Sequence, residues 1–236
     1  MKKYRKYVCY VLSYALVLTL FLLSGLGGSR AITVLSENAP ISVKRCVVID
    51  PGHGGVDGGA TSCTGKLESA FNLEISLRLN DLMHLLGIQT KMIRTADCSV
   101  YTEGNTIAAK KVSDLKQRVR MIEGSSDPLL ISIHQNYYGD GRYSGAQVFY
   151  APTEGSRELA DCLQNAFIKT VNPTSHRNIK KADGIYLMQH ISCPGVLIEC
   201  GFLSNHQEEA KLRDGEYQKK LCAVIASQTA AYLSRT

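Results

Sequence analysis

One stretch near the start of the chain constrains its fold more than any other. The apolar run Val47-Val48-Ile49 is followed closely by Pro51 and by Gly52-His53-Gly54-Gly55. An apolar, β-branched run predicts a buried strand, and Pro51 cannot continue a hydrogen-bonded ladder. The glycines allow backbone torsions and close approaches that a side chain would forbid. The pattern therefore predicts a strand that ends here and presents His53 in a loop, placed for chemistry rather than for packing.

Two later apolar runs also end in polar side chains. His134 follows Ser132-Ile133, and Glu199 follows Val196-Leu197-Ile198. In open α/β sheets, ligands bind beyond the carboxyl ends of the strands, where side chains from several strands meet. We therefore expect His53, His134 and Glu199 to converge on one site.

The rest of the chain from residue 45 alternates strand and helix patterns. From Leu67 to Leu86, apolar residues recur at spacings of three and four, which predicts a helix with one apolar stripe. Further helices are expected over Ser113–Glu123, Ser156–Thr170 and Glu216–Leu233, and further strands over Ile88–Ile93, Leu129–Ile133, Ala146–Tyr150, Ile185–Met188 and Val196–Ile198. This alternation predicts an α/β sandwich.

The N-terminal residues are typical of a targeting segment. Basic residues precede a stretch from about Tyr7 to Leu26 that carries no charge. At roughly 1.5 Å per residue this stretch is just long enough to cross a ~30 Å hydrocarbon core, and its basic flank would stay in the cytoplasm. Small residues over Gly27–Ala31 offer a cleavage site. We expect a signal anchor or signal peptide over residues 1–28, a linker over 29–44 and one exported domain over 45–236.

The net charge of +6 is weak evidence for a nucleic-acid partner, and we expect none. Five of the 27 Lys and Arg residues lie in or beside the N-terminal segment. The densest basic patch elsewhere runs from Lys110 to Arg120, and we interpret it as a solvated helical face. The eight cysteines include no CxxC pair and no zinc-knuckle spacing, so we expect mostly buried free thiols.

The histidines indicate a possible metal site. A hydrolytic zinc site takes three protein ligands, commonly two histidines and a carboxylate, and keeps a fourth position for water. His53 and His134 supply the two imidazoles. Glu68, at the start of the expected helix, fits best as the carboxylate, with Asp57 and Glu74 as alternatives.

A second acid is needed for hydrolysis, because a carboxylate that does not bind the metal can accept the proton of the attacking water. Glu199 is our candidate for this base, since an unpaired charge at the end of an apolar run is costly unless it has a function. Cys200 follows it directly, but the sequence identifies no base that would activate this thiol as a nucleophile.

Four ordered motifs resemble the successive motifs of the zinc-dependent N-acetylmuramoyl-L-alanine amidases. They are Val48–Gly55, Glu68, Ser132–Asn136 and Glu199–Asn205, and the resemblance extends from about Cys46 to Leu233. It implies a single three-layer α/β domain with a six-stranded mixed sheet flanked by helices. It also implies one Zn²⁺ held by His53, Glu68 and His134, with Glu199 as the catalytic carboxylate. The implied substrate is peptidoglycan, cleaved at the amide between N-acetylmuramic acid and L-alanine.

Secondary positions match the family as well. Arg94 and Arg118 resemble arginines of its next strand and helix, and we interpret both as structural or as supports of the site. The chain departs from the family at Ser69, where a basic residue is common, and at Met188-Gln189-His190, where an arginine often lies near the substrate. His190 is a candidate for that contact, although a surface role is the simpler interpretation. We assign no role to the three remaining histidines, His84, His176 and His206.

Within the family, the chain is similar to the sporulation branch, which removes stem peptides from spore-cortex muramic acid before muramic δ-lactam forms. The basic segment Lys110–Leu115, the tail Tyr217–Lys220 and the lack of wall-binding repeats carry this resemblance. It implies a location at the developing spore envelope, membrane attachment through the N-terminal segment, and an accessory exported lipoprotein as a partner.

Three other classes of protein compete with this interpretation. A catalytically inactive wall-binding or regulatory module on the same fold would have lost a metal ligand or Glu199, and none is lost here. A zinc deacetylase acting on glycans usually carries paired aspartates beside histidines, and a zinc metalloprotease carries His-Glu-x-x-His. The sequence contains neither pattern.

Overall fold

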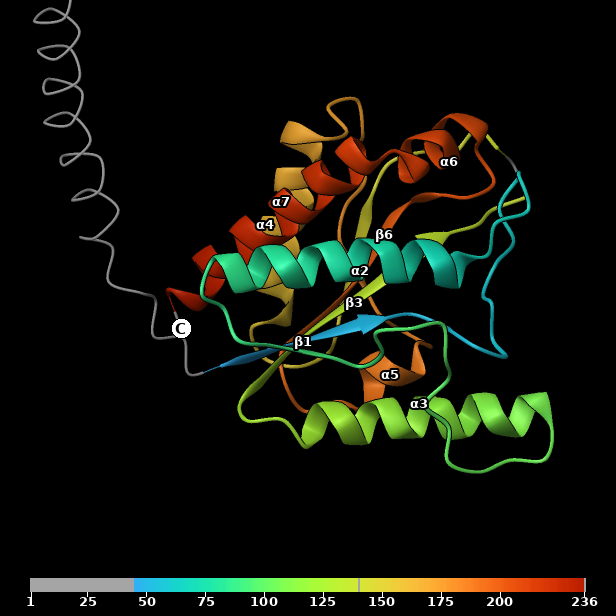
Figure 1. The fold of residues 1–236 in the computed structure, drawn as a ribbon. Helices are drawn as coiled ribbons and strands as arrows, with labels where there is room; N and C mark the ends of the chain where they lie inside the picture. The colour runs from blue at the N-terminus through green and yellow to red at the C-terminus, as the bar shows by residue number, and fades with distance from the viewer. Residues whose placement is uncertain (1–44, 140, 236) are drawn as a thin grey trace, which may run out of the picture. The chain divides into compact units, whose positions relative to one another are not determined.

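The computed structural model describes residues 45–139 and 141–235 (Figure 1). The predicted targeting segment over 1–28 and the predicted linker over 29–44 lie outside this part of the chain. Within the described ranges, no helix combines the length and the apolar character that a membrane span requires.

In the described part of the chain, six strands form one mixed sheet with the order β2-β1-β3-β6-β4-β5. The strands are β1 (Cys46–Pro51), β2 (Thr90–Met92), β3 (Pro128–Asn136), β4 (Gln147–Tyr150), β5 (Lys180–Lys181) and β6 (Gly195–Phe202). The first four in the sheet order run parallel, whereas β4 pairs antiparallel with β6 and parallel with β5. The expected six-stranded mixed sheet is confirmed.

Helices cover both faces of the sheet and complete three layers. They are α2 (Glu68–Leu85), α3 (Ile107–Glu123), α4 (Ser156–Thr170), α5 (Tyr186–His190), α6 (His206–Arg213) and α7 (Gly215–Leu233). Figure 1 shows α2, α4, α6 and α7 on one side and α3 and α5 on the other. Val47 and Ile49 pack into the core under α2, while Val48 packs into the core under α3 and α5. The run is apolar without interruption because both faces of β1 are buried.

Some elements differ from the sequence-based expectation. The expected strand Ile185–Met188 is wrong, because this segment enters the short helix α5, and the edge strand of the region is the exposed pair of lysines in β5. Leu187 and Met188 are buried against the α3 side of the sheet. A short apolar run of this kind fits either a buried helix turn or a strand, so periodicity alone could not decide.

The apolar pattern did not indicate the start of one helix or the existence of another. Helix α3 begins at Ile107 rather than at Ser113, because the Thr106 side chain caps its first turn by accepting a hydrogen bond from the Ala109 amide at 3.1 Å. Helix α6 was not expected, and Asn205 caps it in the same way. Caps of this kind start a helix without any apolar periodicity.

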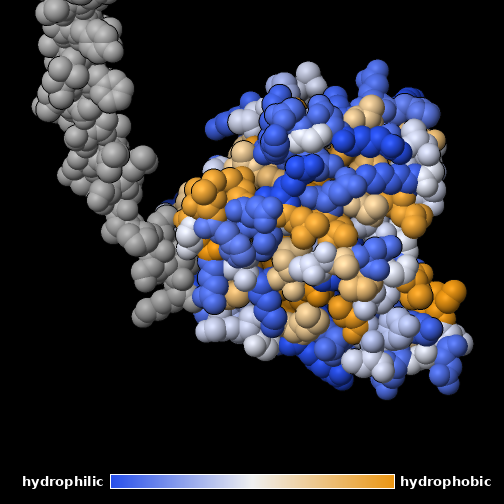
Figure 2. Space-filling model, in the orientation of Figure 1, coloured by the Kyte–Doolittle hydropathy of each residue, from blue (hydrophilic) through white to orange (hydrophobic). Residues whose placement is uncertain are grey.

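The surface on the side drawn in Figure 1 is mostly hydrophilic, and polar side chains separate its apolar patches (Figure 2). Large apolar side chains exposed in the described ranges include Leu85, Ile107 and Tyr138. Scattered exposed apolar residues are normal for a soluble domain. These scattered residues therefore do not by themselves mark a binding surface.

Candidate active site

The carboxyl ends of β1, β3 and β6 bring the predicted residues to one edge of the sheet. The register pairs Asp50 with Ser132 and Ser132 with Leu197, and two residues further along it pairs His134 with Glu199. Alternate residues of a strand point to the same face. These side chains therefore point to the face that α3 and α5 cover, and the expected convergence of strand ends is observed.

His53 lies in a loop that two arginines hold in place. Its φ angle of 60° is in the left-handed region, which is uncommon for a residue other than glycine. Arg118 donates to the His53 carbonyl at 2.8 Å, and Arg94 donates to the Pro51 and Gly52 carbonyls at 2.9 and 3.0 Å. Both arginines are buried, so the structural role expected for them is confirmed.

His53, Glu68 and His134 form a compact group that could hold a metal ion. His53 Nε2 lies 3.3 Å from Glu68 Oε2, and His134 Nδ1 lies 3.0 Å from Glu68 Oε1. One nitrogen or oxygen of each residue lies within 4.8 Å of the others. Two imidazoles and one carboxylate are the donor set of many catalytic zinc sites.

Two glycines leave the space that this group needs. A Cβ added at Gly52 would lie 2.2 Å from His134 Nε2, and one added at Gly59 would lie 2.6 Å from Glu68 Oε2. Heavy atoms do not approach so closely without displacement. The glycines around His53 therefore serve close packing against the His134 and Glu68 side chains as well as loop geometry, and the residues present fit a bound metal.

Hydrogen bonds behind the three side chains fix their orientation. Asp57 Oδ2 lies 2.9 Å from His53 Nδ1, an arrangement that directs Nε2 toward Glu68. Asn72 donates to Glu68 Oε1 at 3.2 Å and to the Gly52 carbonyl at 3.1 Å. Such outer partners orient metal ligands and tune their basicity. Burial disfavours a charged imidazole, yet Glu68 and Asp57 raise the pKa of His53 to about 9, so the cluster attracts positive charge.

The sequence left Asp57 and Glu74 open as alternatives to Glu68. Asp57 pairs with His53 Nδ1 and lies outside the three-residue group, and it also accepts from Lys111 at 2.7 Å. Glu74 points away and pairs with Lys66 at 2.7 Å. Asp57 therefore has an orienting role in place of the alternative ligand role.

Glu199 lies beside the group. It is the register partner of His134, and its Oε2 is buried with no hydrogen-bond partner among the described residues. The pKa of Glu199 is raised to about 7, chiefly because burial disfavours the charged form. The nearby Glu68 adds to this rise, whereas His134 and His53 oppose it. A carboxyl group with a pKa close to the working pH suits transfer of protons in both directions.

Two other sequence candidates do not belong to the site, namely Cys200 and His190. Cys200 is fully buried, and burial raises the pKa of its thiol, which excludes a ready nucleophile. The described cysteines are free thiols and four are buried, namely Cys46, Cys193, Cys200 and Cys222. His190 is exposed and stacks on the Tyr186 ring with centroids 3.8 Å apart. It therefore has the surface role that was the simpler interpretation.

The interpretation of Lys110–Arg120 as a solvated face is wrong in part. Lys116 and Arg120 are exposed, as expected, but Arg118 is buried and donates to Asp50 and Asp114. Lys111 pairs with Asp57 behind His53. A helical charge run does not show which of its members face a neighbouring loop, so these contacts could not be predicted from the sequence.

A three-layer α/β domain with a His–Glu–His group and an adjacent glutamate at the strand ends defines a class of hydrolases built to hold a metal. The family model described as N-acetylmuramoyl-L-alanine amidase matches residues 47–229, and the chain belongs to this family of enzymes. The amidase-type fold and the enzyme class expected from the motifs are confirmed.

Relatives and solved structures agree with this assignment. The chain is 36% identical over 228 residues to the germination-specific N-acetylmuramoyl-L-alanine amidase of Bacillus subtilis (strain 168), which covers 95% of this chain and 93% of the relative. It is similar to the CwlD amidase from Clostridioides difficile, solved in complex with the GerS lipoprotein, with a TM-score of 0.77, 37% identity, and coverage of 81% and 99%. Another structure, an N-acetylmuramoyl-L-alanine amidase from Clostridium difficile 630, gives a TM-score of 0.70 at 31% identity, with coverage of 81% and 98%.

Proposed function

We propose that this amidase is an exported zinc hydrolase that removes stem peptides from spore-cortex peptidoglycan, before muramic δ-lactam forms. The bond cleaved is the amide between N-acetylmuramic acid and L-alanine. The observation that carries the proposal is the compact group of His53, Glu68 and His134 with Glu199 beside it, on the fold of an amidase family. No member of this set has been replaced, which argues against an inactive wall-binding module.

His53, Glu68 and His134 would hold the zinc. When bound, zinc would lower the pKa of a water molecule and polarise the carbonyl of the scissile amide. Asp57 and Asn72 keep His53 and Glu68 in the orientation that binding requires. The buried arginines behind the loop hold the backbone on which His53 stands.

Glu199 would act as the proton carrier. In its ionised form the carboxylate takes a proton from the attacking water, and it then returns the proton to the nitrogen of the departing L-alanine. Its pKa of about 7 makes both directions accessible at neutral pH. Its buried Oε2 has no hydrogen-bond partner among the described residues, so this oxygen remains available to the reacting groups.

The cellular setting is proposed from the relatives and the N-terminal sequence. One relative is named germination-specific, and the CwlD structure contains a lipoprotein. We infer that residues 1–28 export the enzyme as a signal anchor or signal peptide, that residues 29–44 link them to the catalytic domain, and that an exported lipoprotein assists it at the spore envelope. Crosslinking in sporulating cells should recover such a lipoprotein; full activity and zinc content without any recovered partner would contradict this part.

Mass spectrometry of muropeptides tests the activity directly. The full chain is incubated with cortex peptidoglycan and zinc, and the products are compared with those from chain treated with a chelator. We expect free stem peptides beginning with L-alanine and muramic acid with a free lactyl carboxylate. Glycan cleavage, deacetylation, or cleavage within the stem instead of these products would contradict the proposal.

A further inference from the structure

A cavity of about 340 Å³ adjoins the metal-ligand group. His53 and His134 line it, and its remaining wall comes largely from α3, from α5 and from the residues just before α5, including Leu115, Ile185 and Leu187. The scissile amide must lie at the metal-ligand group if the proposed function is correct. The part of the substrate next to that amide would then occupy this cavity, which makes its side chains candidates for selecting the substrate.

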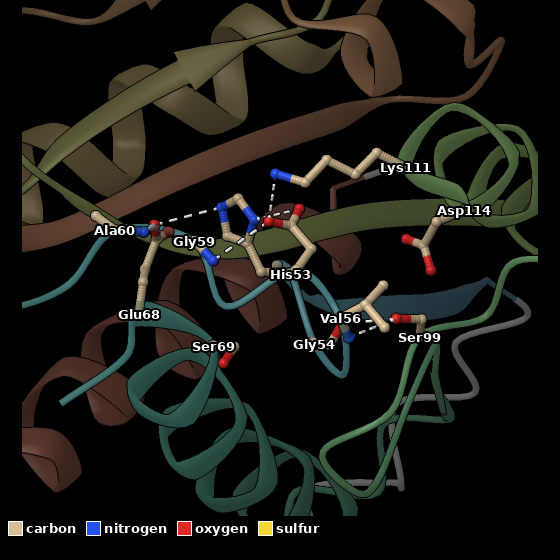
Figure 3. A network of polar contacts seen from close by, with 12 residues as sticks. His53, Gly54, Val56, Gly59, Ala60, Glu68, Ser69, Ser99, Lys111 and Asp114 are labelled. Atoms are coloured by element: carbon tan, nitrogen blue, oxygen red, sulfur yellow. Dashed lines mark hydrogen bonds and ion pairs between the residues drawn. The ribbon is translucent and has the colours of Figure 1, made fainter. Parts of the chain in front are cut away.

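Lys111 brings a positive charge to this cavity. Its side chain extends from α3 toward His53, and its Nζ lies 2.7 Å from Asp57 Oδ1 (Figure 3). The side chain is 48% exposed, so the ammonium group is held in place while water still reaches it. A lysine ammonium has three N–H donors, and the bond to Asp57 uses one of them. The others can bind an anionic group in the cavity.

The other charged groups that line the cavity are already engaged. Arg118 is buried and donates to Asp50, Asp114 and two backbone carbonyls, those of Pro51 and His53. The acids Asp50 and Asp114 are thereby paired with Arg118, and Asp57 is paired with His53 and Lys111. These bonds use four of the five N–H donors of Arg118, and its side chain is only 3% exposed. Lys111 is the more exposed of the two cations and has two donors left for a ligand.

We propose that Lys111 selects acidic stem peptides by binding a carboxylate one residue beyond the scissile amide. This inference rests on the proposed function. Consecutive Cα atoms are about 3.8 Å apart, so a group at that position stays close to the ligand end of the cavity. At the α-carbon of that residue, a stem with D-glutamate carries a carboxylate, whereas a stem with D-isoglutamine carries a neutral amide.

A purely structural role for Lys111 makes a different prediction. If Lys111 served only to neutralise Asp57 and so to position His53, its loss would slow the cleavage of every stem to the same degree. Binding of a substrate carboxylate instead makes the loss depend on the charge of the stem. The two roles can therefore be separated with a pair of substrates that differ in one group.

The test compares N-acetylmuramoyl-L-alanyl-D-glutamate with N-acetylmuramoyl-L-alanyl-D-isoglutamine, each with its γ-carboxyl blocked as an amide, using the full chain with zinc. The readout is the ratio of kcat/KM for the acidic stem to that for the amidated stem. Lys111→Met should lower this ratio about threefold to tenfold, as expected for a partly exposed charge pair in a cavity, and salt should weaken the preference of the unaltered chain. Lys111→Arg should retain most of the preference for the acidic stem.

Lys110→Met is the matched control, because the Lys110 ammonium lies over the Tyr101 ring, 5.1 Å from its centroid, and does not line the cavity. It should leave the ratio unchanged. An equal loss for both stems in Lys111→Met would overturn the inference, even if the amidase activity stands. If the unaltered chain cleaves neither stem, the proposed function fails separately. In that case, calorimetry can still measure the binding of both stems to the Glu199→Gln variant. The inference is overturned if this variant binds the two stems equally well, or if adding Lys111→Met leaves a preference for the acidic stem.

Discussion

Glu68 joins the two histidines of the site, since each of its carboxylate oxygens faces one imidazole. Its side chain is only 6% exposed and also accepts from the amides of Ala60 and Gln135 at 3.0 and 3.2 Å. Burial opposes the ionised form, but His134 and His53 hold the pKa of Glu68 well below its usual range. The carboxylate is therefore ionised and fixed before a cation arrives.

Replacement of the proposed ligands should remove the metal. His53→Ala and His134→Ala should each abolish tight zinc binding, and Glu68→Ala should weaken it severely, because a site with two ligands cannot complete the coordination of zinc. Atomic spectroscopy of the purified chains measures the zinc content. His176→Ala is a control on an exposed histidine outside the group. Undiminished zinc in all three ligand variants would rule out this ligand set.

Glu199→Gln should separate the base from the ligands. The amide keeps nearly the same shape but cannot accept a proton, and loss of a general base typically costs about 10²–10⁴ in rate. We expect hydrolysis of a defined muropeptide to fall at least about a hundredfold while zinc stays bound. Steady-state kinetics beside metal analysis measures both, with Glu74→Gln as a control outside the site. Near-normal turnover, or loss of zinc, would mean that Glu199 is misassigned.

Among the elements, the turn from β1 into its loop sets the spacing of the site. Gly52 follows directly on β1, and His134 of β3 packs against it so closely that no Cβ fits. The same turn is anchored by Arg94 and Arg118, which come from beyond β2 and from α3. The loop is thus positioned by neighbouring elements rather than by its own sequence alone.

Gly52→Ala should damage metal binding more than folding. The added methyl group would lie 2.2 Å from His134 Nε2, so the imidazole must shift from its position beside Glu68. Mispositioning of a ligand typically costs about 10–100-fold in metal affinity. A competition titration with a zinc chelator measures this, and Gly139→Ala, where an added Cβ meets nothing within 4 Å, is the control. Equal zinc affinity in both variants would show that His134 is not held by this contact.

At the scale of the whole molecule, a buried ion pair connects the sheet to the α3 layer. Asp50 of β1 accepts from Arg118 of α3 and from Ser132 of β3, and all three side chains are buried. Burial alone would raise the pKa of Asp50, but Arg118 and Ser132 outweigh it and hold that pKa below its ordinary value. The charge of Asp50 therefore stabilises the folded state.

This pair should make the fold sensitive to acid. A carboxyl group with a lowered pKa contributes stability above its ordinary pKa of about 4, and that contribution is lost as the pH falls further. Asp50→Asn should destabilise the fold by up to about 3–5 kcal/mol at pH 7, since it leaves the Arg118 charge buried with one acid fewer. The difference in free energy of unfolding between this variant and the unaltered chain should become smaller at acidic pH. Urea denaturation at neutral and acidic pH measures it.

Asp183→Asn is the control for that comparison, because Asp183 is exposed and pairs only at the surface with Lys181. It should change the free energy of unfolding little at either pH. If the difference in free energy of unfolding between Asp50→Asn and the unaltered chain stayed constant down to low pH, the stabilising role given to the Asp50 charge would be contradicted.

The sequence by itself determined the features that depend on local order. An uninterrupted apolar run predicted β1, three strand ends identified His53, His134 and Glu199, and the motif order identified the family. These features could be predicted because they depend on residues that are close in the sequence. Such residues indicate burial on both faces of a strand, chain reversal at glycine and the order of the motifs.

Tertiary structure alone decided which side chains meet across the fold. It formed α5 in place of a strand, buried Arg118 beneath the His53 loop, and set Lys111 of α3 against Asp57 of that loop. The physical reason is that each of these contacts joins segments far apart in the chain, and their geometry exists only once the sheet has packed against its helices. The periodicity of apolar residues indicates whether a residue can be buried, but only the packing of the elements determines which residues it contacts.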